Sequence, residues 1–149
     1  MQPALTAGDE NKALIRRWFE EVWNRGRTEL VDELRAPDAI VTGLREGNAE
    51  SRGGADFKAF HAELRGAFPD LAVKVEDILA EGDKVAVRIT FEGTHLGDIM
   101  SVAPTGRRVC FSGISIARIS GGKIVEGWNS LDRLGLLRQI DAFPAAGAR

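Results

Sequence analysis

The 149-residue sequence contains only one cysteine, Cys110, and two histidines. A single cysteine cannot form a disulfide within the chain, and no group of cysteines and histidines has the spacing of a zinc site. We therefore expect no disulfide framework and no bound metal, and a reducing compartment suits the chain. Cys110 lies in a predicted apolar strand beside no base and is expected to be an inert core thiol.

An excess of charge of one sign is also lacking. The 20 basic and 22 acidic residues give a formal net charge of -2, which offers no electrostatic footprint for nucleic acid or an anionic membrane. The chain does not begin with a basic segment and an apolar run, and no apolar stretch approaches the ~20 residues that span a bilayer. We expect a cytoplasmic protein whose partner is a small molecule or another protein chain.

The length and composition are those of one globular domain. Hydrophobic residues make up 44% and charged residues 28% of the chain, which are ordinary values for a folded protein. A chain of this length can bury one core but not two. We place the domain at residues 9–141, after a flexible N-terminus at 1–8 and before a C-terminal tail at 142–149.

The first half of the chain has the apolar spacing of helices. A helix that begins with Asp9 as its cap carries one broad apolar stripe and ends at Gly26. A short second helix follows at 29–35. A third helix, with three phenylalanines on one stripe, begins after a polar loop at 45–54 and ends before Pro69.

The second half has the alternation of strands. Apolar and polar residues alternate along 71–76 and 85–95, and a Gly-Asp turn between these segments makes a hairpin. A third long strand at 109–119 is apolar on both faces, as expected of a central strand in a covered sheet. A Gly-Gly turn joins it to a last strand at 123–129.

This order of elements predicts an α+β fold. A brief strand at 39–42 and a closing helical segment at 131–140 complete the pattern. Helices followed by hairpin strands pack on one face of a curved antiparallel sheet, and an apolar pocket lies between them. Alternation along 85–95 places His95 on the concave, apolar face, opposite Thr94.

Short motifs follow one another between residues 10 and 141. They are 19–26 (FEEVWNRG), 68–71 (FPDL), 81–86 (EGDKVA), 93–95 (GTH), 104–106 (PTG) and 122–128 (GKIVEGW). Each motif alone is weak, but in this order they resemble the SnoaL-like ester or polyketide cyclases. This family belongs to the nuclear transport factor 2-like superfold. The resemblance implies a cone of three N-terminal helices and a curved sheet that encloses a pocket.

The resemblance also implies an activity. The best-known members close a ring by intramolecular aldol condensation of a polyketide ester, with an acidic side chain as general acid and base and no metal or cofactor. Asp132, four residues after Trp128, matches the position of that acid. His95 is then expected either to hydrogen-bond the enolate oxygen or to hold Asp132 in orientation. Members of this fold commonly pair through the outer face of the sheet, so we expect a homodimer.

The sequence departs from the family pattern at the expected rim of the pocket. Val102-Ala103 replaces a pair that often ends in proline, Thr42-Gly43 stands where a histidine often follows the first strand, and Gly127 replaces another frequent histidine. The substrate therefore does not carry over from the family. The chain also contains no tyrosine, which ketosteroid isomerases and limonene-type epoxide hydrolases need, and this argues against both of those reactions.

Each candidate residue also has a structural interpretation. Asp132 precedes a helical segment and would serve equally as its N-terminal cap, and His95 would serve as a half-exposed residue at the end of a strand. His61 carries no motif and is expected to be structural. The expected substrate-binding residues are Trp128, Phe91, Phe111, Trp18 and Glu126. Glu126 shares strand parity with Trp128 and Asp132, which a β-bulge would change.

Two functions from different classes remain after this reasoning. The first is an enzyme that cyclises or isomerises a hydrophobic carbonyl compound by acid and base catalysis, with Asp132 as the base. The alternative is a non-catalytic domain of the same fold that binds a small molecule or another chain. A cavity lined by both Asp132 and His95 favours catalysis, and a collapsed or wholly apolar one favours binding.

Overall fold

The computed structural model describes residues 3–45 and 49–142, and its elements follow the predicted α+β order. They are α1 (Ala7–Arg17), η1 (Trp18–Asn24), η2 (Thr28–Leu30), α2 (Val31–Leu34), β1 (Arg35–Thr42), β2 (Glu50–Arg52), α3 (Gly53–Ala67), β3 (Ala72–Glu81), β4 (Lys84–Thr94), β5 (Arg108–Ser120), β6 (Lys123–Leu131) and α4 (Arg133–Gln139). The tail predicted at 142–149 lies, from residue 143 onward, outside the described residues. Within the described part, no helix is long and apolar enough to cross a membrane.

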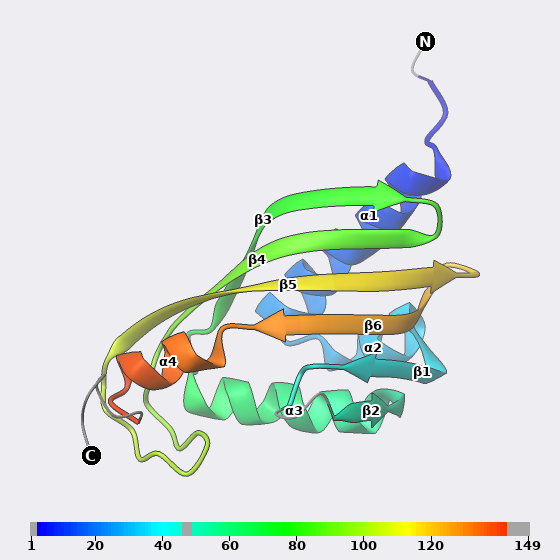
Figure 1. Ribbon diagram of the computed structural model, residues 1–149. Helices are drawn as coiled ribbons and strands as arrows, with labels where there is room; N and C mark the ends of the chain where they lie inside the picture. Colours follow the sequence, from blue (N-terminus) through cyan, green and yellow to red (C-terminus); the bar gives the residue numbers. More distant parts are fainter. Residues whose placement is uncertain (1–2, 46–48, 143–149) are drawn as a thin grey trace.

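The strands form one six-stranded sheet in the order β2-β1-β6-β5-β4-β3. The four long strands β3 to β6 pair antiparallel, as predicted. The expectation of a wholly antiparallel sheet is corrected at β1, which runs parallel to β6. Parallel neighbours need a long crossover connection, and the chain from α3 through β5 supplies it. The end of β4 and the start of β5 curve towards one end of α3, so that the helices lie against one side of a curved sheet (Figure 1).

The N-terminal cap of the first helix differs from the prediction by three residues. Thr6, and not Asp9, is the N-terminal cap: its hydroxyl accepts a hydrogen bond from the backbone N–H of Asp9 at 3.0 Å. The Asp9 carboxylate in turn accepts from the backbone N–H of Thr6 at 3.1 Å, which completes a capping box. Residues 7 and 8, predicted to be flexible, therefore belong to α1. Gly26 ends the helical segment at a φ of 69°, as predicted.

The helices cover only one face of the sheet, and this determines which side chains are buried. Alternate residues of β4 face the core, and His95 continues that face with 0% exposure, as predicted. The expectation that β5 is covered on both faces is wrong. Ile114 is 53% exposed on its outer face, and Cys110, predicted to be a core thiol, is exposed as well. Alternate side chains of β5 face outward because the helices pack against the concave face alone.

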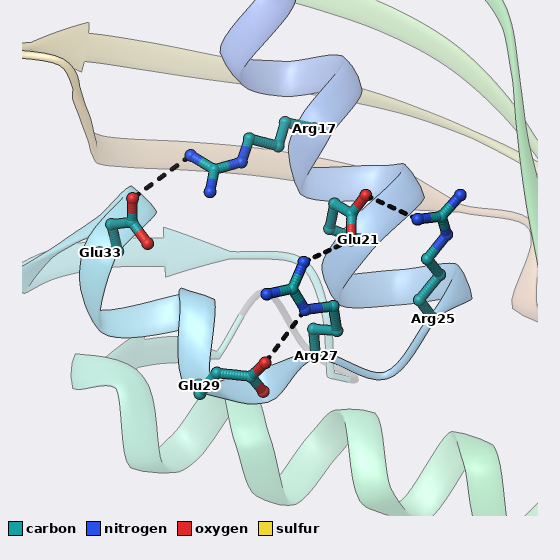
Figure 2. Close-up of polar contacts among 6 residues, drawn as sticks. All are labelled: Arg17, Glu21, Arg25, Arg27, Glu29 and Glu33. Carbon is teal, nitrogen blue, oxygen red and sulfur yellow. Dashed lines mark hydrogen bonds and ion pairs between the residues drawn. The ribbon is translucent and has the colours of Figure 1, made fainter.

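The surface of α1, η1 and α2 carries a network of ion pairs (Figure 2). The carboxylate of Glu21 contacts Arg25 at 3.1 Å and Arg27 at 3.0 Å. Arg27 also contacts Glu29, and Arg17 contacts Glu33. Exposed pairs of this kind contribute little to stability, but here they balance three arginines with three glutamates. These six side chains together therefore carry no net charge.

Asp70 links the segment before β3 to the end of β4 by hydrogen bonds. Its carboxylate accepts hydrogen bonds from the backbone N–H of Thr94 at 2.7 Å and from the Thr94 hydroxyl at 2.8 Å, and these lower the pKa of Asp70. Because the pKa of Asp70 is lower in the folded protein than its unfolded value of about 3.9, the ionised carboxylate stabilises the fold at pH values above about 3.9. This contribution is lost as the pH falls through the pKa of the folded state.

We therefore expect Asp70→Asn to unfold at lower urea concentration than the parent at pH 7, and the difference to narrow as the pH falls below about 4. Urea unfolding at pH 7 and at pH 3 measures this difference. Asp77→Asn, a substitution of an exposed carboxylate of β3, is the control. A difference for Asp70→Asn that stays constant between the two pH values would contradict the assignment.

Candidate functional site

An inner cavity of about 50 Å³ lies between the helices and the concave face of the sheet. Aromatic and aliphatic side chains from α1, η1 and α3 and from strands β1, β4, β5 and β6 form most of its wall. Among the described residues that line it, Arg35 is the one charged side chain, and Ser115 and Asn129 are polar. The Ser115 hydroxyl donates to the side-chain oxygen of Asn129 at 2.8 Å, so these two groups satisfy one another.

An outer cavity of about 570 Å³ adjoins the inner one, because Leu44 and Leu131 line both. Phe60 of α3 and Phe111 of β5 form its apolar wall, and the loop between β4 and β5 contributes Asp98. This volume falls within the range of small-molecule sites, about 300–1,000 Å³. The two cavities together can hold a ligand with a small head and a larger apolar body.

The charged residues around the outer cavity were not predicted. The guanidinium of Arg45 donates two hydrogen bonds to the Glu63 carboxylate, at 3.1 and 3.2 Å, and lies 5.4 Å from the centre of the Phe60 ring. Arg133 donates to the backbone carbonyls of residues 43 and 44. Tertiary folding brings these groups together from distant parts of the sequence, and no local sequence motif predicts them. Among the described residues, no three His, Cys, Asp or Glu side chains are grouped as metal ligands would be.

Three of the predicted substrate-binding residues line the cavities. Trp18 and Phe91 face the inner cavity, and Phe111 faces the outer one. Phe91 and Phe111 are paired across β4 and β5, and their rings stack at 4.8 Å with an interplanar angle of 5°. The stacked pair forms a continuous aromatic wall along both cavities.

Trp128 and Glu126, also predicted to bind substrate, lie on the outer face of the sheet instead. The ammonium nitrogen of Lys84 lies 5.5 Å from the centre of the Trp128 ring. The Glu126 carboxylate forms an ion pair with Nε of Arg118 at 3.0 Å. The cause is a register shift between β5 and β6, where Val125 is an extra residue. This bulge reverses the parity of β6. The residues of β6 that line the inner cavity are Ile124, Gly127, Asn129 and Leu131.

Asp132 follows β6 directly and is exposed. Its carboxylate accepts a hydrogen bond from the backbone N–H of Gly135 at 2.9 Å and so caps α4. The side chain lines a hollow on the outer face, beside Ser112 and Ile114, and neither cavity. Its two chain neighbours, Leu131 and Arg133, do line the outer cavity.

His95 is fully buried at the start of the loop between β4 and β5. The backbone N–H of Thr105 donates to its Nδ1 at 3.2 Å, so Nδ1 is an acceptor and the ring proton resides on Nε2. Nε2 is buried without a hydrogen-bond partner among the described residues. The ring packs against Phe68 at 5.8 Å and lines neither cavity.

The structure does not bring Asp132 and His95 together. The backbone N–H of Asp132 donates to the carbonyl of Ser112, and that of His95 to the carbonyl of Arg107. These two partners are five positions apart in sequence, about 17 Å in an extended chain. His61, expected to be structural, is buried with its Nε2 at 3.3 Å from the Trp23 carbonyl, and burial lowers the pKa of its ring.

Comparison with known proteins identifies the class. A family model for the SnoaL-like polyketide cyclases matches residues 13–140, and the chain belongs to this family. The aklanonic acid methyl ester cyclase DauD of Streptomyces sp. (strain C5) is 34% identical over 129 residues, which cover 85% of this chain and 79% of DauD. The nogalonic acid methyl ester cyclase of Streptomyces nogalater is 30% identical over 125 residues, 82% of this chain and 92% of that enzyme.

Solved structures are similar along nearly the whole chain. TsrD from Streptomyces laurentii has a TM-score of 0.80 at 27% identity and covers 94% of this chain and 100% of its own. AclR from Streptomyces galilaeus, a candidate hydroxylase, has a TM-score of 0.82 at 33% identity and covers 93% of this chain and 85% of its own. The fold predicted from the sequence motifs is therefore confirmed.

Proposed function

We propose that this protein catalyses an intramolecular aldol cyclisation of a polyketide ester, or of a closely related apolar carbonyl compound, inside the two adjoining cavities. The observation that carries the proposal is the pair of neighbouring, largely apolar cavities, the outer one of ligand size, in a chain of the polyketide cyclase family. Relatives are named as cyclases of aklanonic and nogalonic acid methyl esters. Polyketide methyl esters are therefore the first substrates to test.

The reaction needs one base and one acid. A base removes a proton from a carbon next to a carbonyl group, the resulting enolate carbon attacks a ketone of the same molecule, and the new alkoxide takes up a proton. One proton leaves and one returns, so the product is an isomer of the substrate and no oxidant or reductant is consumed. We assign both proton transfers to the carboxylate of Asp132.

This role requires the Asp132 side chain to turn from its cap towards the outer cavity when substrate binds. The position between Leu131 and Arg133, which line that cavity, supports such a movement. For His95 we propose a positioning role. Its hydrogen bonds with Thr105 hold the loop between β4 and β5, and this loop contributes Asp98 to the lining of the outer cavity. Direct stabilisation of an enolate would require the His95 ring itself to line a cavity.

The placement of Asp132 and His95 favours one alternative function. Because neither residue lines the inner or the outer cavity, the chain could bind an apolar ligand there without converting it. This alternative predicts tight binding with no turnover.

A turnover assay separates these functions. We expect aklanonic or nogalonic acid methyl ester, incubated with the protein, to yield a product of unchanged mass and new chromatographic retention. The rate should rise in proportion to protein concentration and persist in EDTA. Binding of the ester without conversion would contradict the cyclase proposal and support the binding domain.

We further propose a cytoplasmic homodimer that pairs through the outer face of the sheet. Large apolar side chains are exposed on that face, among them Ile114 and Ile116 of β5, and such patches mark interaction surfaces. Multi-angle light scattering tests this proposal, and a monomer at micromolar concentration would contradict it.

A further inference from the structure

Arg35 is a buried cation with unpaired donors at the inner cavity. It is the first residue of β1, is 2% exposed and lines that cavity. Its Nη2 donates to the carbonyl oxygens of Ala39 at 3.2 Å and of Ser51 at 3.3 Å. Its Nε and Nη1 are buried with no hydrogen-bond partner among the described residues. Donors of a charged group are especially costly to leave unsatisfied, so this arrangement points to a ligand.

The positive charge of Arg35 also lacks a close counterion among the described residues. Burial lowers the pKa of Arg35, and the charge of Asp56 acts in the opposite direction. Asp56 is exposed on the first turn of α3, and no ion pair within 4.0 Å joins the two. A guanidinium nevertheless stays protonated in proteins. The inner cavity therefore keeps an uncompensated cation in an apolar wall.

We propose that Arg35 binds a carboxylate of the ligand, and that this protein binds apolar carboxylic acids in preference to the corresponding neutral esters. A carboxylate neutralises the buried charge and accepts charge-assisted hydrogen bonds from the free nitrogens, whereas a neutral ester or ketone supplies only the second of these. The inner cavity of about 50 Å³ admits a head group of this size, and the outer cavity of about 570 Å³ holds the apolar body.

The carboxylate defines the substrate class of the proposed cyclase, and this step rests on the proposed function, in which the two cavities hold the substrate. It implies a polyketide that carries a free carboxylate at one end in addition to the carbonyl groups that react. The carboxylate would fix the end that enters first, and so would leave the reacting carbons in the outer cavity.

Binding of octanoate and of methyl octanoate, measured by calorimetry, tests the inference with probes that cannot cyclise. We expect the parent to bind octanoate about 10- to 100-fold more tightly than methyl octanoate. Arg35→Met should abolish this preference. The matched control is Arg118→Met, which removes an arginine from the outer face, and it should keep the preference of the parent.

Thermal unfolding supplies a second measurement. In the absence of ligand, Arg35→Met should melt at or above the temperature of the parent, because an apolar side chain replaces an unpaired buried charge. If Arg35→Met does not fold, Arg35→Gln, which keeps donors for the two carbonyls, takes its place in the binding test. Equal binding of the two probes by the parent, or a preference that survives the loss of the guanidinium, would overturn the proposal.

The two proposals fail in different assays. Failure of the octanoate preference leaves cyclisation of the neutral polyketide esters standing. Failure of turnover leaves the binding result standing, and the cavity would then belong to a carboxylate-binding domain.

Discussion

Replacement of Asp132 by asparagine should lower the rate of cyclisation by about 100- to 10,000-fold, the usual contribution of a general acid or base. An asparagine cannot take up the proton, but its side-chain oxygen can still accept the hydrogen bond from Gly135 that caps α4. The thermal unfolding temperature should therefore stay close to that of the parent. Turnover of the polyketide ester and thermal unfolding, measured on the same preparations, separate the two effects.

Asp98→Asn is the informative companion variant. It removes a carboxylate that does line the outer cavity, from the loop between β4 and β5, and should reduce turnover far less than Asp132→Asn. A larger loss of turnover for Asp98→Asn than for Asp132→Asn would assign the role of base to Asp98. Equal turnover by Asp132→Asn and the parent would remove Asp132 from the mechanism, and an unfolded Asp132→Asn would show that the cap is its main role.

Phe91→Ala should have the largest effect on stability, a loss of about 3–5 kcal/mol in the free energy of unfolding. The ring is 1% exposed and stacks on Phe111, and it forms a T-shaped contact with Trp23 in which the ring centroids are 5.6 Å apart. Truncation removes these contacts and enlarges the inner cavity, whose wall the aromatic residues hold in place. Equilibrium unfolding in urea measures the loss.

Leu134→Ala is the matched control for this stability measurement. Leu134 lies on α4 with 43% exposure, and its truncation should cost about 1 kcal/mol or less. A similar loss for both variants would mean that Phe91 is no more important to the core than an exposed residue of α4.

The hairpins of the second half were predictable because their determinants are local. The Gly82-Asp83 and Gly121-Gly122 turns join strands whose apolar alternation is visible in the sequence, and the structure has both turns where they were expected. The parallel pairing of β1 with β6 was not predictable in this way. It joins Val41 to Gly127, and nothing near either residue specifies a partner so distant in sequence.

The candidate site could be predicted only where strand alternation was regular. Phe91 and Phe111 line the cavities because β4 and β5 pair without interruption. Trp128 faces outward because the extra residue in β6 reverses its parity, and a bulge of this kind has no sequence signature here. Arg35 is separated from the buried Ala39 and Val41 by a register irregularity in β1 and by the exposed Pro37, so no regular alternation in the sequence marks it as buried.

The most direct test of this account is a crystal structure of Asp132→Asn with a bound polyketide ester. The account predicts the apolar body of the ligand against Phe60 and Phe111 in the outer cavity, its polar end towards Arg35, and the side chain of residue 132 turned from the cap towards the ligand. A ligand seated instead in the hollow on the outer face beside Ser112, with both cavities unchanged, would contradict it.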